Sequence, residues 1–299
     1  MIVYDCIMFN DELDILELRL AYMNDRVDKF VIAESSLTHS NINKPLHFRD
    51  NQGRFAQYKD KIIYLEVPPV PQKDSWEGEF YQRNYLKTAL NECSDDDVII
   101  IADIDELIDL DELEKTGKLT TPCMIEMPMY YYFLNLKTQV RWLRTLVSPY
   151  QYLRGFNIGD RLKYPDLDPV ILRGNRAALG WHLSYMFGWD TGLYISKLKS
   201  FSHQEFNTPY YLDERRITTC LQLGVDFLER NSIYEVVNAK KEFPPALYKA
   251  FAETGLLDKL LYQKPGFAFY LNLYHLKYFV KFHIKPRLKP WIDKQLGRR

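Results

Sequence analysis

Residues 98–107 read VIIIADIDEL, a run of apolar residues that ends in three carboxylates. Four β-branched residues and an alanine come first, as in a strand that is buried on both faces of a sheet. Asp103, Asp105 and Glu106 then follow. Ligands of open α/β sheets bind beyond the carboxyl ends of the strands. The stretch therefore predicts both a central strand and the place of a functional site.

The segments before this strand alternate between strand and helix patterns. Apolar runs that predict buried strands occupy residues 2–9, 29–35 and 61–67. Residues 10–23, with Asn10 or Asp11 as the N-cap, and residues 79–93 have the pattern of helices. This order predicts a mainly parallel central sheet with helices on its faces.

Past residue 110 the alternation loosens, and no change of composition marks a linker. Residues 123–136 and 140–147 predict long strands of a second, mixed part. We therefore predict one domain over residues 1–265, with a nucleotide-binding half (1–110) and an acceptor-side half (111–265). Residues 266–299 are basic and aromatic, and they predict a helical tail.

Composition and charge exclude several classes of protein. The 299 residues are 46% hydrophobic with a net charge of −1, which argues for a globular chain and against nucleic-acid binding. Four scattered cysteines are typical of reduced thiols in a cytosol. The first residues lack a signal-peptide pattern, and no apolar run is long enough to span a membrane. We expect a cytoplasmic protein.

The acidic cluster predicts a metal site. Alternate side chains of a strand share a face, so Asp103 and Asp105 are expected to point the same way. Two such carboxylates repel each other unless a cation lies between them, and oxygen ligands suit Mg²⁺ or Mn²⁺ better than zinc. The alternative is a solvated acidic loop, with Glu106 as a charge at a helix N-terminus.

Five stretches, taken together and in this order, resemble glycosyltransferase family 17, the family of the bisecting N-acetylglucosaminyltransferases. They are FNDELDILELRL (9–20), VDKFVIAESSLTHSNINKPLHF (27–48), YQRNYL (81–86), DDDVIIIADIDEL (95–107) and GWHLSYMF (180–187). The resemblance implies a GT-A-type, Rossmann-like α/β fold and an inverting mechanism. It also implies a UDP-sugar donor, with N-acetylglucosamine as the sugar, and a divalent cation, Mn²⁺ or Mg²⁺.

The resemblance also assigns roles at the donor site. Asp103 and Asp105 match the DxD motif of the family, which places Asp105 on the metal and Asp103 on the metal or the donor ribose. Arg83 and Asn84 lie in YQRNYL, and a guanidinium is well shaped for a phosphate. The alternative for Arg83 is an ion pair with an acid of residues 95–97.

Polar residues at the ends of the first two strands complete the predicted donor site. Phe9 and Asn10 close the first strand, and Glu34 and Ser35 close the second. In a GT-A fold this region holds the nucleoside. The alternative for these four residues is ordinary capping of the elements that follow.

The late motif GWHLSYMF supplies further candidates. His182 is the expected late metal ligand, with His203 as the alternative. Inversion requires a carboxylate that takes the proton of the acceptor hydroxyl. Asp190 is the expected base, and Glu205 and Glu126 are the alternatives. Trp181 and Trp189 could stack on the face of a sugar, although packing in the core is the stronger default for both.

These expectations add up to a metal-dependent inverting glycosyltransferase that forms a β linkage in surface polysaccharide or glycoconjugate synthesis. The vertebrate relatives carry a membrane anchor that this sequence does not show, so we expect an oligosaccharide or lipid-linked glycan acceptor. The basic, aromatic tail predicts peripheral contact with an anionic membrane at its inner face.

Two other functional classes remain open. One is a non-catalytic sugar- or nucleotide-binding module. The other is a metal-dependent nucleotidyltransferase, which would normally carry a glycine-rich loop after the first strand. The chain has FNDELD there, without a glycine.

Overall fold

The first four strands form the parallel half of a curled sheet. The computed structural model describes residues 1–174, 177–230, 234–263 and 273–295. β1 (Val3–Phe9) lies between β2 (Lys29–Ser35) and β4 (Val98–Asp103), and β3 (Ile62–Val67) flanks β2. All three pairings are parallel. These strands lie where the sequence predicts them. β1, β2 and β4 are buried on both faces and read as continuous apolar runs, whereas β3 is an edge strand that is mostly half-buried.

The second half of the sheet is mixed. β7 (Leu136–Pro149) runs antiparallel to both β4 and β6 (Cys123–Tyr131), and β9 (Gly180–Ser184) is parallel to β6. The remaining strands pair at the side of these, as β5 (Glu106–Ile108) with β9, β8 (Val170–Arg173) with β6 and β10 (Tyr234–Val236) with β7. The mainly parallel sheet is thus confirmed only for the first half. Only four residues join β6 to β7, and so short a connection permits antiparallel pairing alone.

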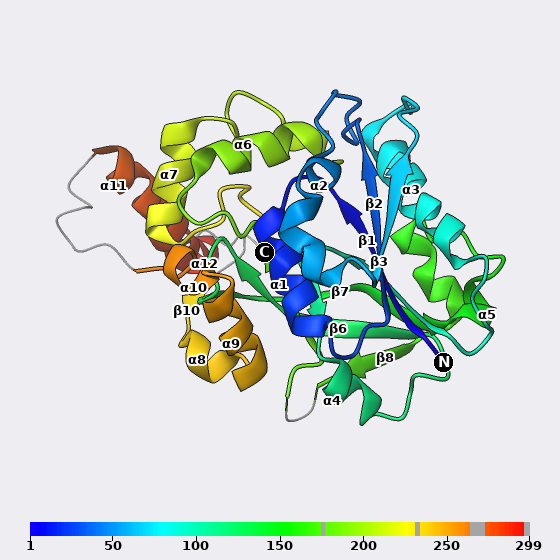
Figure 1. Cartoon of the computed structure of the whole chain (residues 1–299). Coiled ribbons are helices and arrows are strands. Elements are labelled where there is room, and N and C mark those ends of the chain that lie inside the picture. Colours follow the sequence, from blue (N-terminus) through cyan, green and yellow to red (C-terminus); the bar gives the residue numbers. More distant parts are fainter. Residues whose placement is uncertain (175–176, 231–233, 264–272, 296–299) are drawn as a thin grey trace.

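Helices cover both faces of the sheet (Figure 1). α1 (Leu13–Met23) and α9 (Pro245–Glu253) pack on one face with one hydrophobic cluster, which also contains Ile7 and Ile100. The short helix η2 (Leu86–Leu90) packs on the other face with Cys6 and Ile101. The other helices are α2 (His47–Asp50), α3 (Ser75–Tyr85), α4 (Leu110–Glu114), α5 (Tyr150–Leu153), α6 (Thr191–Ser200), α7 (Glu214–Leu223), α8 (Ala239–Glu242) and α10 (Leu256–Lys259), with the short 3-10 helices η1 (Gln52–Tyr58), η3 (Arg161–Leu167) and η4 (Gln204–Phe206).

Two helix starts differ from the sequence prediction. Glu12 occupies the N-cap position of α1 without capping it by a side-chain hydrogen bond, so neither Asn10 nor Asp11 is the cap. α3 begins at Ser75, four residues before the expected start. Asp74 caps it by accepting hydrogen bonds from the Trp76 and Glu77 backbone N–H groups, each 3.0 Å away.

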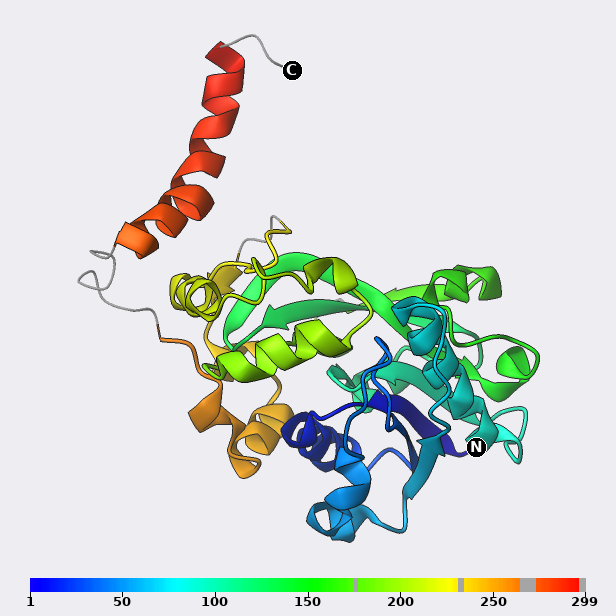
Figure 2. The same ribbon diagram turned by 90° about the horizontal axis from the view of Figure 1, so that it is seen from above.

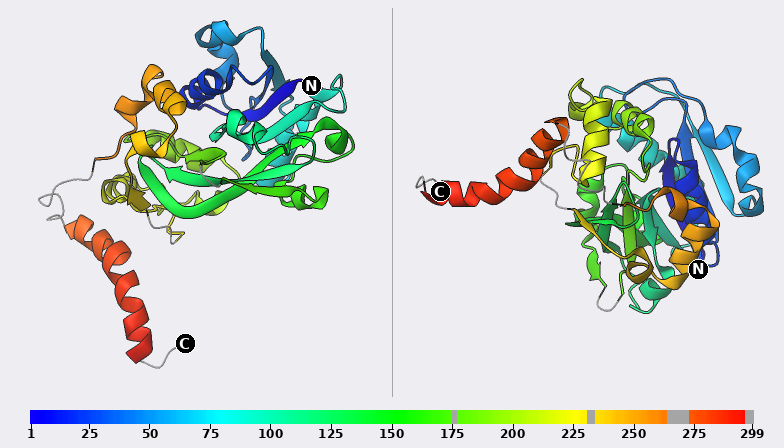
Figure 3. Two further views of the ribbon diagram at one scale, coloured as in Figure 1. Left: turned by 90° about the horizontal axis from the view of Figure 1, so that it is seen from below. Right: turned by 90° about the vertical axis from the view of Figure 1, so that its left-hand side faces the viewer.

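The C-terminal segment is helical over its described residues. α11 (Leu273–Phe279), η6 (Val280–Ile284, a π-helical turn) and α12 (Lys285–Gln295) extend away from the body of the protein (Figures 2 and 3). Tyr278 is buried in a cluster with residues of α7. Residues 266–272 and 296–299 of the predicted tail lie outside the described residues. None of the described helices has the length and apolar character needed to cross a membrane.

Candidate functional site

A cavity of about 940 Å³ lies beyond the carboxyl ends of β1 and β4. Phe9 and Asn10, which follow from β1, line it together with Asp103 and Asp105. This is the edge of the sheet at which α/β proteins bind ligands. The cavity therefore brings together the ends of the first and fourth strands, as the sequence predicts.

Arg19 of α1 binds the backbone of the turn between β4 and β5. Its Nη1 donates hydrogen bonds to the carbonyl oxygens of Asp103 (3.1 Å), Ile104 (3.1 Å) and Glu106 (2.8 Å). The other side of the guanidinium binds both oxygens of Asp5, at 2.6 Å each, and both side chains are fully buried. Asp105 lies in this turn and not on the strand, so simple strand alternation does not describe the Asp103–Asp105 pair.

Two arginines hold the Asp103 carboxylate. Arg83 Nη2 lies 3.3 Å from Oδ1, and Arg161 Nη1 lies 2.9 Å from Oδ2. Burial by itself would raise the pKa of Asp103, but Arg161 and Arg83 hold it well below its usual range. Asp103 is therefore ionised, and each of its oxygens already has a cationic partner.

Glu106 is fully buried at the centre of a hydrogen-bond network. Oε1 accepts from Trp142 Nε1 (2.6 Å), and Oε2 accepts from Thr145 Oγ1 (2.6 Å) and the Asp103 backbone N–H (3.0 Å). Arg161 adds two further hydrogen bonds. The expectation of a helix N-terminal charge is wrong, because α4 begins only at Leu110 and Asp109 is its N-cap.

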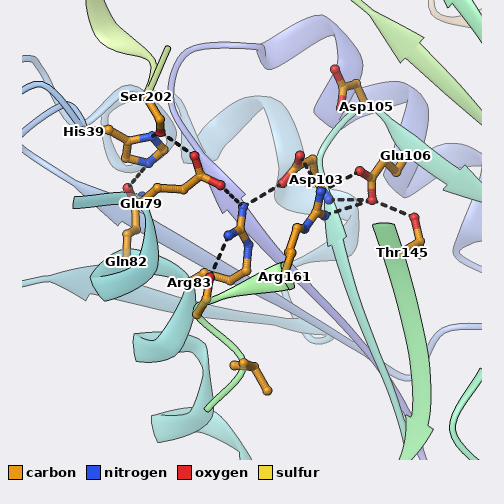
Figure 4. Close-up of polar contacts among 12 residues, drawn as sticks. His39, Glu79, Gln82, Arg83, Asp103, Asp105, Glu106, Thr145, Arg161 and Ser202 are labelled. Atoms are coloured by element: carbon orange, nitrogen blue, oxygen red, sulfur yellow. Dashed lines mark hydrogen bonds and ion pairs between the residues drawn. The ribbon is translucent and has the colours of Figure 1, made fainter. Parts of the chain in front are cut away.

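Asp105 and His182 form the second pair in the cavity. Asp105 Oδ2 lies 3.4 Å from His182 Nε2, and the buried His182 Nδ1 has no hydrogen-bond partner among the residues that the structure describes. Burial would lower the pKa of His182, but the charge of Asp105 and its hydrogen bond raise it. In Figure 4, Asp105 lies apart from the network around Asp103.

The spacing of this pair fits two ligands of one divalent cation. Ligands about 2.1 Å from a six-coordinate ion stand about 3 Å apart when they are adjacent. The described residues contain no group of three or more His, Cys, Asp or Glu side chains that could hold a metal. The protein would thus supply two ligands and leave the other positions to substrate oxygens and water, as is usual for Mg²⁺ sites.

Positive charge surrounds the same cavity. Lys197 of α6 lines it and pairs with Glu12 at 2.5 Å. Burial would lower the pKa of Lys197, but Glu12 and Asp105 raise it, so the ammonium group stays charged. The Nε atoms of Arg83 and Arg161 are buried and make no hydrogen bond within the described structure. The charges of Arg83, Arg161 and Lys197 at this cavity suit a ligand that carries phosphate groups.

A chain of polar contacts runs along the wall of the cavity (Figure 4). Glu79 pairs with Arg83 at 2.6 Å and accepts a hydrogen bond from Ser202 Oγ. Ser202 in turn contacts Nδ1 of His39 at 3.3 Å. Arg83 is thus bound to Glu79 and Asp103, and its alternative pairing with an acid of residues 95–97 is wrong.

Four of the predicted site residues lie outside the cavity lining. Asn84 is exposed on α3. Glu34 is buried and accepts from the Phe48 N–H (2.9 Å) at the start of α2, and Ser35 Oγ accepts from the Leu37 N–H (3.2 Å). Asp190 is the N-cap of α6. Capping therefore accounts for the positions of Glu34 and Asp190, and Ser35 supports the chain just after β2.

The alternative candidates divide in the same way. His203 and Glu205 line the cavity. Glu126 lines a second cavity and pairs with Arg173 at 3.0 Å. Trp181 is buried, and Trp189 stacks on Tyr262 outside the main cavity.

Three basic residues at the site were not predicted from the sequence. Arg161 comes from η3, Arg19 from α1 and Lys197 from α6. None lies in a recognisable pattern of chemistry-bearing residues, and their partners are 14 to 185 positions away in the chain. Arg19 alone of the three lies in one of the five quoted stretches. Its place in a stretch shared with the family was the one sequence feature that could have drawn attention to it.

Comparisons with known proteins place the chain among sequences of known type. The sequence profile described as glycosyltransferase family 17 matches residues 1–239. The chain is 34% identical over 114 residues to the beta-1,4-mannosyl-glycoprotein 4-beta-N-acetylglucosaminyltransferases of Rattus norvegicus and Homo sapiens. These matches cover 35% of this chain and 21% of each relative, so only about a fifth of the length of the curated relatives is spanned.

Proposed function

Because the chain belongs to glycosyltransferase family 17, we propose that it transfers a sugar from a UDP-sugar to a glycan acceptor and inverts the anomeric centre. The observation that carries the proposal is the Asp105–His182 pair beside the arginine-held Asp103, in one cavity at the strand ends. The N-acetylglucosaminyltransferase activity named for the relatives favours N-acetylglucosamine as the sugar.

The donor is proposed to lie along the cationic wall of the cavity. The ammonium group of Lys197 and the positive charges of Arg83 and Arg161, all of which line the cavity, are proposed to face the diphosphate. Phe9 and Asn10 are placed against the nucleoside. Asp103 is assigned to the donor ribose, because both of its oxygens are already oriented by arginines.

Asp105 and His182 are the proposed ligands of Mn²⁺ or Mg²⁺. When bound, such an ion neutralises the charge that develops on the leaving UDP. The protein's own contribution is to fix both ligands before the substrate arrives. Arg19 fixes the turn that carries Asp105, and β9 carries His182.

The fold and the domain assignment extend the same proposal. A GT-A-type fold is supported by the parallel order β3-β2-β1-β4 with the site at its carboxyl edge. Residues 1–265 are proposed to form one catalytic domain, with residues 1–110 on the donor side and residues 111–265 on the acceptor side.

The C-terminal helix is proposed to hold the enzyme at the inner face of an anionic membrane, where a lipid-linked glycan or oligosaccharide would be the acceptor. Leu288 and Trp291 are exposed on α12, beside the exposed cations Lys285, Arg287 and Lys289. Sedimentation with vesicles of anionic or neutral phospholipid tests this. We expect the wild type to bind anionic vesicles but not neutral ones, and the double variant Trp291→Ala/Leu288→Ala to lose this binding. Equal binding by the double variant and the wild type would contradict the proposal.

A donor-binding experiment tests the transferase proposal. Thermal shift and calorimetry would compare UDP, GDP, CMP and UDP-N-acetylglucosamine, each with Mn²⁺ and with a chelator. We expect stabilisation by the UDP compounds that needs Mn²⁺ and disappears in Asp105→Ala. Asp111→Ala, which removes an exposed carboxylate of α4, is the matched control. Failure of folded wild type to bind any nucleotide would favour a binding module, and release of pyrophosphate would favour a nucleotidyltransferase.

A further inference from the structure

An aromatic surface forms part of the rim of the main cavity. Trp76 of α3 is 41% exposed, and its ring lies 4.7 Å from that of His203, nearly perpendicular to it. We call this surface the aromatic rim; it consists of Trp76, Phe80, Phe201, His203 and Phe206, all of which line the cavity. The aromatic rim belongs to the same cavity as the proposed metal ligands.

An exposed tryptophan at the edge of a polar cavity is typical of a ligand-binding surface. The apolar C–H face of a sugar ring packs on an indole, while its hydroxyl groups need hydrogen-bond partners beside the ring. Trp76 provides the indole, and His203 and Glu205 provide the polar groups. The rim therefore has the composition of a carbohydrate subsite.

His203 and Glu205 form a hydrogen-bonded pair. His203 Nδ1 lies 2.7 Å from Glu205 Oε1, and the described residues offer Nε2 no hydrogen-bond partner. Burial would raise the pKa of Glu205, but the hydrogen bond to His203 lowers it, so the carboxylate is ionised. A carboxylate on one ring nitrogen orients the imidazole and leaves the other nitrogen to accept a proton.

The rim is fixed relative to the donor side of the cavity. Ser75 Oγ donates a 2.7 Å hydrogen bond to the Ser202 carbonyl, which joins the neighbours of Trp76 and His203. Ser202 also begins the chain of contacts through Glu79 and Arg83 to Asp103. The two sides of the cavity are thus connected by ordered polar groups.

Building on the proposed function, we propose that the aromatic rim receives the acceptor sugar: Trp76 stacks on its ring, and His203 is the general base, oriented by Glu205. The acceptor oxygen forms a bond to the anomeric carbon of the donor. The bond from that carbon to the diphosphate oxygen breaks, and its electron pair leaves with UDP. The hydroxyl proton passes to His203 Nε2, and the resulting imidazolium is stabilised by Glu205.

Binding of simple sugars tests the stacking role of Trp76. The probes are the β-methyl glycosides of glucose, galactose, mannose and N-acetylglucosamine, measured by saturation-transfer NMR in the presence of UDP and Mn²⁺. Trp76→Ala should weaken binding by about tenfold or more. Trp189→Ala is the matched control, because Trp189 is equally exposed but lies outside the cavity. Equal losses in the two variants, or no glycoside binding by wild type that binds UDP, would overturn the proposal.

Steady-state release of UDP, with the best-binding glycoside as acceptor, tests the base. His203→Ala should lower kcat by roughly 10²- to 10⁴-fold, the usual contribution of a general base, with UDP binding unchanged. Glu205→Gln should lower kcat by a larger factor than it raises the acceptor KM, a split that a purely structural role would not produce. His47→Ala, outside the cavity, should behave as wild type.

The outcomes separate this inference from the proposed function. Wild-type activity in His203→Ala would refute the base while leaving a UDP-sugar transferase intact. Failure of the wild type to bind UDP with Mn²⁺ would refute the transferase proposal itself. Loss of UDP binding in His203→Ala would show that the histidine serves the donor, which also contradicts its assignment to the acceptor.

Discussion

Arg161 and Glu106 form a two-pronged ion pair inside the protein, with Nη1 2.9 Å from Oε1 and Nη2 3.0 Å from Oε2. The pair joins η3 to β5, which are 55 positions apart in the chain. Because Nη1 also binds Asp103, the same guanidinium orients a residue of the cavity. The pair is therefore both part of the interior and a support of the site.

Removal of Arg161 should destabilise the protein strongly. Arg161→Met leaves the Glu106 carboxylate buried without its cation, which typically costs about 3–5 kcal/mol. Urea unfolding would measure the loss. Arg154→Met is the matched control, because its pair with Asp95 is exposed and such pairs contribute about 0–1 kcal/mol. Equal free energies of unfolding in the two variants would contradict the role given to the buried pair.

Asp190→Ala should affect stability more than catalysis. Asp190 accepts hydrogen bonds from the Gly192 and Leu193 N–H groups at the start of α6, and loss of such a cap costs about 1 kcal/mol. Thermal unfolding and UDP release measured on one preparation check both effects. A loss of kcat of roughly 100-fold or more at unchanged stability would return Asp190 to the role of base that the sequence suggested.

Arg19→Gln should loosen the turn that carries Asp105. The variant loses its charge opposite Asp5 and most of its hydrogen bonds to three carbonyl groups. We expect a loss of about 3–5 kcal/mol in the free energy of unfolding, together with weaker binding of Mn²⁺ and UDP. Arg26→Gln, on the exposed side of the same region, is the control. If folded Arg19→Gln binds UDP as tightly as the wild type, the turn keeps its shape without the hydrogen bonds from Arg19.

The stability of the protein should fall in mild acid through His39. Loss of water around its ring lowers the pKa of His39 below 6.5, in spite of the opposing charge of Glu79. A pKa that is lower in the folded protein than in the unfolded chain means that protonation favours unfolding. The contribution of neutral His39 is present above pH 6.5 and is lost as the pH falls through the folded pKa.

The check on His39 compares two pH values in two proteins. Free energies of unfolding at pH 7.5 and pH 5.5 would be measured for the wild type and for His39→Gln, which keeps polar atoms beside Gln82 and Ser202. The wild type should lose more stability than the variant. The same loss in both would assign the acid sensitivity to other groups.

The first half of the fold could be predicted from the sequence because local pattern and final structure coincide there. β1, β2 and β4 are buried on both faces, so each appears in the sequence as a continuous apolar run whose limits predict the strand. The mixed half could not be predicted in the same way. β7 lies antiparallel beside β4 through pairs of residues nearly 50 positions apart. The local pattern of apolar and polar residues carries no information about a pairing over that distance.

The candidate site shows the same division. Asp103 and Asp105 follow a strand whose end could be predicted, and His182 lies in a recognisable motif. The side chains that set their charges come from elsewhere: Arg161 from a loop-rich region and Arg19 from the buried face of α1. Glu106 was misread because burial, and not position along the chain, makes it the acceptor of five hydrogen bonds.

Arg19 binds the turn after β4 through its backbone carbonyl oxygens. Every amino acid has such an oxygen, so these hydrogen bonds do not depend on the side chains of the turn. Related sequences can therefore exchange the side chains of this turn while its path stays the same. The backbone path of the turn is thus set independently of the side chains that the turn carries. This independence leaves the turn free to change its exposed side chains without a change in the path of the backbone.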